Sequence, residues 1–271
     1  MKQISQLMEE LKAKGEKAFI AYVTAGDPDL KSTVDLVQTL SEAGADIIEL
    51  GVPFSDPLAD GPTNQKAAER ALKNGCHLGG IFEAVLEVRK RGIETPLVLF
   101  SYLNPLYKFG FDEVAKRAKE VGIQGILSVD LTPESFVKEE ILFKKALQKE
   151  GLEPIFLLSP TTKKSRWRLI EEESKGFIYY VSRTGTTGAK MDLSDTLVDE
   201  LQRVKDVVKK PLVVGFGLSH PDQVKKISPY CDGIVVGSAL VKELEESRTF
   251  NIANNKIYNL VSQFKKALRE V

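Results

Sequence analysis

An apolar run at positions 45–48 is followed directly by Glu49 and then by a loop with several prolines that carries Asp56 and Asp60. The run is short and mostly aliphatic, which is typical of a buried strand in a parallel sheet. Glu49 therefore stands where such a strand leaves the core, and partial burial raises the pKa of a carboxyl group toward neutrality. A carboxyl group with such a pKa exchanges protons at physiological pH, so this segment predicts acid/base chemistry.

Three glycine-containing loops in the second half of the chain indicate a site for an anion. They are 182–188, 215–219 and 237–239, each at the end of an apolar run. Glycine lets backbone N–H groups approach phosphate oxygens closely, and a helix that begins at Ser238 would add the partial positive charge of its first turn. Taken singly, each loop is equally well explained by glycines in turns and a serine helix cap. The three loops together favour a phosphate, and the first of them could close over a ligand as a lid.

Eight short apolar runs, each followed by turn-forming residues and an amphipathic segment, must position these groups. This alternation is typical of a parallel α/β fold, and eight units in 271 residues match a single (β/α)8 barrel domain over 1–271. In such barrels the loops after strands seven and eight often bind phosphate. An open doubly wound sheet is the alternative, because alternation alone does not prove closure. The predicted strands are 18–24, 46–50, 96–102, 124–129, 154–159, 176–181, 211–217 and 232–237.

Extra helices are expected at three places beyond the repeating units. The N-terminal residues have the apolar spacing of an amphipathic helix, and the longest gap, after the second strand, holds the helical stretches 65–73 and 78–91. A final helix near the eighth strand spans 257–268, whereas the polar segment 243–255 shows no readable pattern. The pair Asp27–Pro28 is interpreted as a helix cap followed by proline at the first helical position.

Composition argues against several classes of partner. Lys and Arg together number 38, as do Asp and Glu, so no net charge would attract nucleic acid or an anionic membrane. No apolar stretch reaches the length of a membrane span and the N-terminus lacks the features of a signal peptide, so a cytoplasmic protein is expected. Cys76 and Cys231 have no metal-ligand spacing and are expected to be reduced thiols.

One longer motif resembles a known family. Residues 51–63, Gly-Val-Pro-Phe-Ser-Asp-Pro-Leu-Ala-Asp-Gly-Pro-Thr, together with 24–28, 180–185 and 214–217, are similar to the α subunit of tryptophan synthase. The resemblance extends from the N-terminal helix to about position 242. It implies a barrel lyase that cleaves indole-3-glycerol phosphate to indole and glyceraldehyde 3-phosphate without a cofactor. It also implies a partner, a β subunit that uses pyridoxal phosphate and receives the indole through a tunnel.

The resemblance assigns the two catalytic roles to carboxyl groups. Glu49 would be the general acid/base, and Asp60 would bind the indole N–H. The cleavage is a retro-aldol step, in which indole C3 gains a proton, the neighbouring hydroxyl loses one, and the ring nitrogen carries positive charge in between. The alternative for Glu49 is a structural ion pair at the barrel mouth, and for Asp60 and Asp56 it is the capping of loop N–H groups.

Further binding residues also follow from the resemblance. It places aromatic side chains against the indole and near the acid/base, although each of them could equally belong to the barrel core. It also implies a lid, a phosphate site and a partner surface. The residues are Tyr22 and Phe100 against the indole, Tyr179 near Glu49, Thr187 of the lid within reach of Asp60, Gly188, Gly217, Gly237 and Ser238 for the phosphate, and Asp56, Asn104 and Pro105 for the β subunit.

Three positions depart from the family pattern. Asn64 stands where an apolar residue is expected, Thr132 replaces a proline, and Thr186 takes a position often held by valine. None of them removes a proposed catalytic group, but the detailed geometry of the loops depends on them.

Three other functions stay open at this point. A related phosphate-binding barrel enzyme, such as an isomerase or a synthase, would share the phosphate loops but lack the loop 53–62. A non-catalytic regulatory subunit that binds a phosphate ligand would not need both Glu49 and Asp60. A free-standing lyase would release indole without any β subunit, and nothing in the sequence argues against it.

Overall fold

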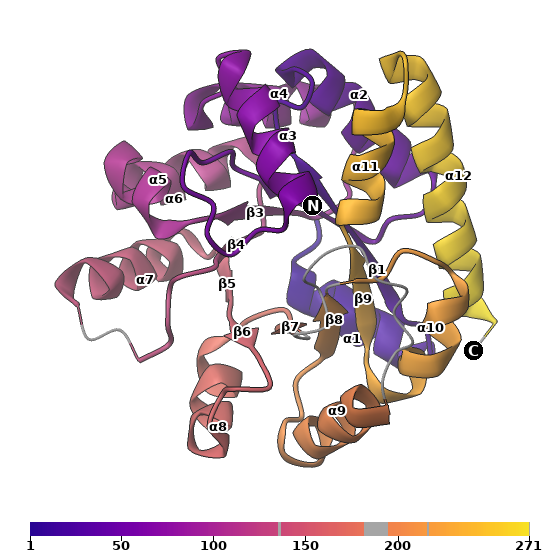
Figure 1. The fold of residues 1–271 in the computed structure, drawn as a ribbon. Coiled ribbons are helices and arrows are strands. Elements are labelled where there is room, and N and C mark those ends of the chain that lie inside the picture. Colours follow the sequence, from indigo (N-terminus) through magenta and orange to yellow (C-terminus); the bar gives the residue numbers. More distant parts are fainter. Residues whose placement is uncertain (135–136, 182–194, 216, 271) are drawn as a thin grey trace.

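The computed structural model describes residues 1–134, 137–181, 195–215 and 217–270, and its strands form a parallel sheet (Figure 1). The strands are β1 (Ala18–Thr24), β2 (Ile47–Gly51), β3 (Leu97–Ser101), β4 (Gly125–Ser128), β5 (Glu153–Ile155), β6 (Leu157–Leu158), β7 (Ile178–Val181), β8 (Leu212–Gly215) and β9 (Gly233–Val236). Their order in the sheet is β5-β4-β3-β2-β1-β9-β8-β7-β6.

The sheet closes into a barrel at the fifth of the predicted strands. β5 pairs with β4 and β6 pairs with β7, yet β5 and β6 are consecutive pieces of one chain segment, interrupted only at Phe156. The N–H of Tyr179 in β7 donates to the carbonyl of Phe156 at 3.1 Å, so hydrogen bonding continues across this interruption. The predicted (β/α)8 barrel is confirmed, and the open doubly wound alternative is wrong.

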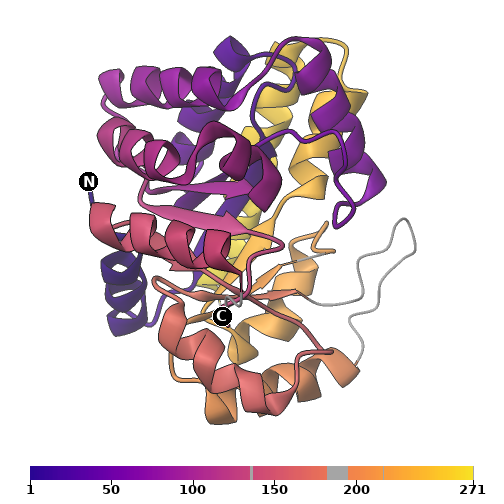
Figure 2. The same ribbon diagram turned by 90° about the vertical axis from the view of Figure 1, so that its left-hand side faces the viewer.

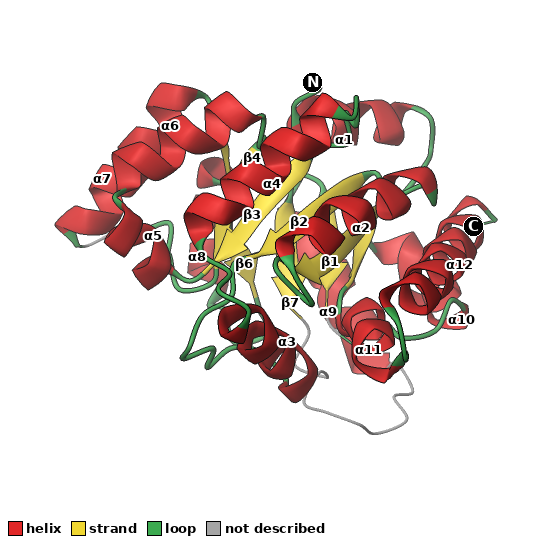
Figure 3. Cartoon of the chain, turned by 90° about the horizontal axis from the view of Figure 1, so that it is seen from above, coloured by secondary structure: helices red, strands yellow, loops and turns green. Residues whose placement is uncertain are grey.

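Helices surround the barrel, as the two turned views show (Figure 2, Figure 3). Within the described ranges, none of them combines the length and the apolar character needed to cross a membrane. The helices are α1 (Ile4–Ala13), α2 (Leu30–Glu42), α3 (Pro62–Lys73), α4 (Leu78–Lys90), α5 (Leu103–Phe109), α6 (Phe111–Val121), α7 (Lys138–Glu150), α8 (Lys164–Glu173), α9 (Asp195–Val207), α10 (Asp222–Ile227), α11 (Ser238–Glu246) and α12 (Phe250–Arg269).

The extra helices lie where the sequence predicts them, with two differences. α5 was not predicted, and α12 begins at Phe250, so most of the segment 243–255 is helical. Thr249 caps α12, because its side chain accepts the N–H of Ile252. The sequence of this segment shows no helical pattern because its residues are mostly polar. In the first turns of α12, only Ala253 is buried. The interpretation of the whole chain as one domain stays a prediction.

Alternation along β1 and β2 decides which side chains face the barrel interior. Phe19 packs outward with the helices, whereas Ile20 and Tyr22 belong to the interior cluster. Ile47 of β2 is also interior, and Glu49 follows it by two residues on the same face. Because Tyr22 and Glu49 are register partners, their side chains enter the interior side by side.

A buried ion pair at the amino end of β2 ties the last helix to the barrel. Lys265 Nζ of α12 lies 2.5 Å from Asp46 Oδ2, which also accepts the N–H of Phe19 at 2.7 Å. Burial raises the pKa of Asp46, and Lys265 opposes this effect. The pair thus joins α12 to both β1 and β2.

Replacing Lys265 with methionine should lower the free energy of unfolding by roughly 3–5 kcal/mol, because Asp46 would stay buried without its cation. The matched control is Lys266→Met, since this exposed lysine lies 3.9 Å from Glu270 and should contribute only about 0–1 kcal/mol. Urea unfolding of both variants at neutral pH is the measurement. Equal losses in the two variants would show that Lys265 does not hold Asp46.

Candidate active site

Glu49 is a buried acid that has no partner among the residues that the structure describes. Its side chain is 0% exposed, and among the described residues neither carboxylate oxygen has a hydrogen bond or an ion pair. Burial raises the pKa of this carboxyl to about 8. The ion-pair alternative for Glu49 therefore finds no support in the described part of the chain. At neutral pH the group is an acid that can give up its proton and then accept another.

Asp60, on the loop between β2 and α3, accepts a hydrogen bond, which Glu49 does not do in the described structure. The hydroxyl of Tyr102, directly after β3, donates to Asp60 Oδ2 at 3.0 Å, and the N–H of Ala59 donates to the same hydroxyl oxygen at 2.9 Å. The Tyr102 ring packs against Phe54 at 5.2 Å between centroids. Burial raises the pKa of Asp60, while the Tyr102 hydrogen bond lowers it. The hydrogen bond thus favours the ionised form of Asp60.

Three aromatic side chains lie together beside Glu49. The rings of Tyr22 and Phe100 are 5.2 Å apart in an edge-on arrangement, and those of Phe100 and Tyr179 are 6.5 Å apart. Burial is the largest effect on both tyrosines and raises the pKa of each, so the phenols stay neutral. The structure brings these predicted residues together, and their contacts with an indole stay predictions.

Glycines at the barrel mouth make room for the two tyrosines. A Cβ atom on Gly51 would lie 2.3 Å from the Tyr22 hydroxyl oxygen, and one on Gly215 would lie 2.2 Å from that of Tyr179. Nonbonded atoms do not approach so closely, so a larger residue at either position would displace a phenol from the mouth.

The phosphate loops that the structure describes follow neighbouring strands. Gly217 follows β8 with φ at 80°, a conformation that favours glycine, and Gly237 follows β9 and precedes Ser238 of α11. The first turn of α11 has N–H groups without helical carbonyl partners, so it offers donors at the mouth. Thr187 and Gly188, which the sequence predicts for the lid and the phosphate, lie outside the described residues.

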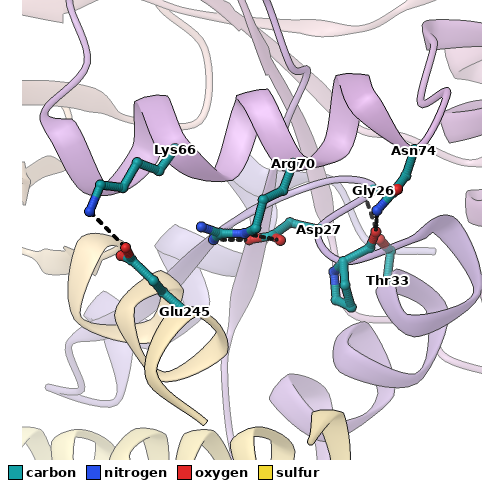
Figure 4. A network of polar contacts seen from close by, with 8 residues as sticks. Gly26, Asp27, Thr33, Lys66, Arg70, Asn74 and Glu245 are labelled. Atoms are coloured by element: carbon teal, nitrogen blue, oxygen red, sulfur yellow. Dashed lines mark hydrogen bonds and ion pairs between the residues drawn. The ribbon is translucent and has the colours of Figure 1, made fainter. Parts of the chain in front are cut away.

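Ion pairs fix α3, the helix that follows Asp60 (Figure 4). Arg70 of α3 donates to both oxygens of Asp27 at 2.8 and 2.7 Å, and Asp27 is 1% exposed. Lys66, one turn earlier, lies 2.8 Å from Glu245 of α11. These contacts hold α3 both to the loop after β1 and to the helix of the phosphate region.

The prediction that Asp27 caps a helix is wrong. α2 is capped by Asp29, whose side chain accepts the N–H of Ser32 at 2.7 Å. Asp27 instead pairs with Arg70, because a guanidinium presents two donors that match the two oxygens of a carboxylate. The sequence offered two aspartates two positions apart, and spacing alone does not tell which of them caps the helix.

The residues predicted to contact a partner lie at the same end of the barrel. Asp56 is exposed on the loop between β2 and α3, near Leu58, which is 93% exposed. Asn104 is exposed and Pro105 partly buried in α5, which follows β3. The structure brings these residues to the mouth that Glu49 faces, and their contact with a partner stays a prediction.

Other predicted features have simpler outcomes. Cys76 and Cys231 are free and buried, and burial raises their pKa values to about 11 and about 12, so both thiols stay protonated. The described residues contain no group of three or more His, Cys, Asp or Glu side chains arranged to hold a metal ion. Asn64 lies in the first turn of α3, and its Oδ1 is buried without a hydrogen bond among the described residues.

Comparisons with known proteins agree on one family. A family model described as "Tryptophan synthase alpha chain" matches residues 8–269. The tryptophan synthase alpha chain of Geotalea uraniireducens is 47% identical over 248 residues, which cover 92% of this chain and 91% of that protein. The one of Geobacter sulfurreducens is 43% identical and covers 100% of this chain and 98% of that protein.

Solved structures give the same result. A crystal structure of tryptophan synthase subunit alpha from Legionella pneumophila superposes with a TM-score of 0.89 at 38% identity and covers 100% of both chains. A chain from the tryptophan synthase a2b2 complex of Pyrococcus furiosus superposes with a TM-score of 0.84 at 39% identity and covers 92% of this chain and 98% of that one.

The free energy of unfolding of the Glu49→Gln variant should exceed that of the parent by an amount that grows as the pH rises. The pKa of Glu49 is about 8 in the folded protein, against an ordinary value of 4.5. Between these values the folded protein holds a proton that the unfolded chain has released, so the stability of the parent falls with rising pH. Glutamine has no such proton to lose, and the gain should reach a few kcal/mol near the upper value.

Urea unfolding at intervals between about pH 5 and pH 8 measures this gain. Glu69→Gln, at an exposed position of α3, is the control and should show no trend with pH. A gap between Glu49→Gln and the parent that stays constant over this range would show that Glu49 titrates like an exposed carboxyl.

Proposed function

The chain belongs to the tryptophan synthase alpha chain family, and from this membership we infer how its residues divide the work of the reaction. It is an α subunit of tryptophan biosynthesis, a lyase that cleaves indole-3-glycerol phosphate to indole and glyceraldehyde 3-phosphate, and its partner is a β subunit. The observation that carries the division of roles is the pair of carboxyl groups at the mouth: Glu49 is buried without a hydrogen-bond partner among the described residues, and the half-buried Asp60 accepts from a phenol.

Glu49 moves both protons. In its protonated form it donates to C3 of the indole ring, which leaves a positive charge on the ring nitrogen and a carboxylate on Glu49. The carboxylate then accepts the proton of the hydroxyl on the adjacent side-chain carbon. The bond between C3 and that carbon breaks, its electrons return to the ring, and an aldehyde forms. Glu49 ends protonated, as it began, so the step needs no other acid or base.

Asp60 stabilises the charge that arises between these two transfers. As a carboxylate it accepts a hydrogen bond from the indole N–H, and this contact strengthens when the ring becomes cationic. Tyr102 supports the role, because its donated hydrogen bond favours the ionised form of Asp60. The two carboxyl groups thus work in opposite protonation states at the same pH.

The other predicted residues bind the remaining parts of the substrate. The indole ring packs among the aromatic side chains, and the phosphate accepts N–H groups from the glycine loops, where the first turn of α11 adds partial positive charge. A lid residue reaches toward Asp60. The residues are Tyr22, Phe100 and Tyr179 for the ring, Gly188, Gly217, Gly237 and Ser238 for the phosphate, and Thr187 for the lid.

The two carboxyl groups account for the chemistry without a cofactor, and pyridoxal phosphate belongs to the β subunit. The partner contacts the mouth of the barrel through Asp56, Asn104 and Pro105, which lie on the loop after β2 and on α5. The balanced charge of the chain supports a small-molecule substrate rather than a nucleic acid, and we propose that the enzyme is cytoplasmic.

Purified chain should release indole from indole-3-glycerol phosphate slowly when alone and faster with an added tryptophan synthase β subunit. Glu49→Gln should lose at least about 100-fold in turnover, because acid/base groups typically contribute roughly 10²–10⁴. Glu69→Gln should keep the parent rate. Release of indole that the β subunit does not change would favour a free-standing lyase. No indole from the parent in either mixture would sink the lyase assignment and favour a related phosphate-binding enzyme.

Tyr102→Phe should shift the acidic limb of the kcat profile to higher pH. Removal of the hydroxyl deprives the Asp60 carboxylate of a donor that lowers its pKa, so the pKa rises and the ionised form is lost earlier on acidification. Tyr258→Phe, on the exposed surface of α12, should leave the profile in place. A loss of kcat with an unmoved limb would mean that Tyr102 only packs the loop.

A further inference from the structure

Tyr22 carries a buried hydroxyl that the roles given above leave unexplained. The residue lies on the inner face of β1, opposite Glu49, and is 8% exposed. Its ring meets Phe100 edge-on, and it lies so close to Gly237 that a Cβ there would be 3.1 Å from Tyr22 Cδ1. A phenylalanine would make these ring contacts equally well, so the contacts do not explain why a hydroxyl is present at this position.

The hydroxyl is placed at the mouth, over the backbone of β2. Its oxygen would lie 2.3 Å from a Cβ on Gly51, so the absence of a side chain there leaves it room. No hydrogen bond joins Tyr22 to either carboxylate in the described part of the chain.

Thr24 adds a second hydroxyl to this corner. It lies two residues beyond Tyr22 on the same face of β1, is 2% exposed, and lowers the pKa of the Tyr22 phenol. Among the described residues, however, its Oγ1 has no well-formed hydrogen bond. Leaving a buried hydroxyl unsatisfied costs about 1–3 kcal/mol, so the unpartnered Thr24 Oγ1 beside the Tyr22 hydroxyl indicates that a ligand at the substrate site supplies the missing partner.

The polar groups of the substrate identify that partner, a step that rests on the proposed function. In the proposed reaction, Asp60 accepts a hydrogen bond from the indole N–H, Glu49 accepts the proton of the reacting hydroxyl, and the glycine loops bind the phosphate. One polar group is left, the hydroxyl on the carbon between the reacting carbon and the one that bears the phosphate. We infer that the Tyr22 hydroxyl, supported by Thr24, binds this non-reacting hydroxyl and thereby selects a glycerol side chain over a deoxygenated one.

Two ligands separate this role from ring packing. Indole-3-glycerol phosphate has the hydroxyl, whereas indole-3-propanol phosphate has the same ring and phosphate without either hydroxyl. Binding of both is measured by calorimetry in the full-length Glu49→Gln chain, which does not consume the first ligand, with and without Tyr22→Phe. Tyr22→Phe should weaken the glycerol ligand about tenfold and the propanol ligand less than about twofold. Thr24→Val should act in the same direction.

Tyr180→Phe is the matched control. Tyr180 is also a buried phenol, but it lies on the outer side of β7 and donates to Glu200 at 2.8 Å, so its loss should leave the ratio of the two affinities unchanged. Equal weakening of both ligands by Tyr22→Phe, or no weakening of either, would overturn the inference. If neither ligand binds the Glu49→Gln chain that keeps Tyr22, the proposed function itself fails.

Discussion

The proposed site depends on one carboxyl group, that of Glu49, which is fully buried and has no partner in the described part of the chain. Other buried carboxylates of the described barrel are compensated: Asp46 has Lys265, and Asp27 has Arg70. Glu49 has neither a cation nor a hydrogen bond among the described residues, so its charged form is far more costly than its neutral form. Burial therefore favours the protonated form of this side chain at neutral pH, which is the form that the proposed reaction begins with.

Closure of the sheet makes this burial possible. In the closed barrel, the inner face that carries Glu49 is filled by side chains from all the described strands. The loops then bring the second carboxyl to the same mouth. Asp60 reaches it from the end of β2, and α3 behind it is tied to Asp27 by Arg70 and to α11 by Lys66. The barrel strand fixes the position of Glu49, and the anchored loop fixes the position of Asp60.

The sequence could predict what depends on local order and not what depends on distant partners. The positions of Glu49 and Asp60 at the mouth were predictable, because the end of an apolar run and a specific loop motif mark them, whereas their catalytic roles stay predictions. Tyr102 and the pair of Asp27 with Arg70 were not, since these contacts join residues 42 and 43 positions apart and depend on orientation in space. The start of α12 was not predicted for another reason. Its first turns bury few side chains, so the apolar periodicity that indicates a helix is weak there.

Burial is the largest effect on the pKa of both proposed catalytic carboxyl groups, and it raises both values. Glu49 is fully buried whereas Asp60 is partly exposed, so the two groups already differ in depth. One hydrogen-bond donor adds to this difference. Tyr102 gives its hydrogen bond to Asp60, whereas the neutral phenols of Tyr22 and Tyr179 lie near Glu49 without bonding to it in the described structure. The proposed acid and the proposed anion, eleven residues apart in the sequence, thus differ because burial and hydrogen bonds are both unequally distributed between them.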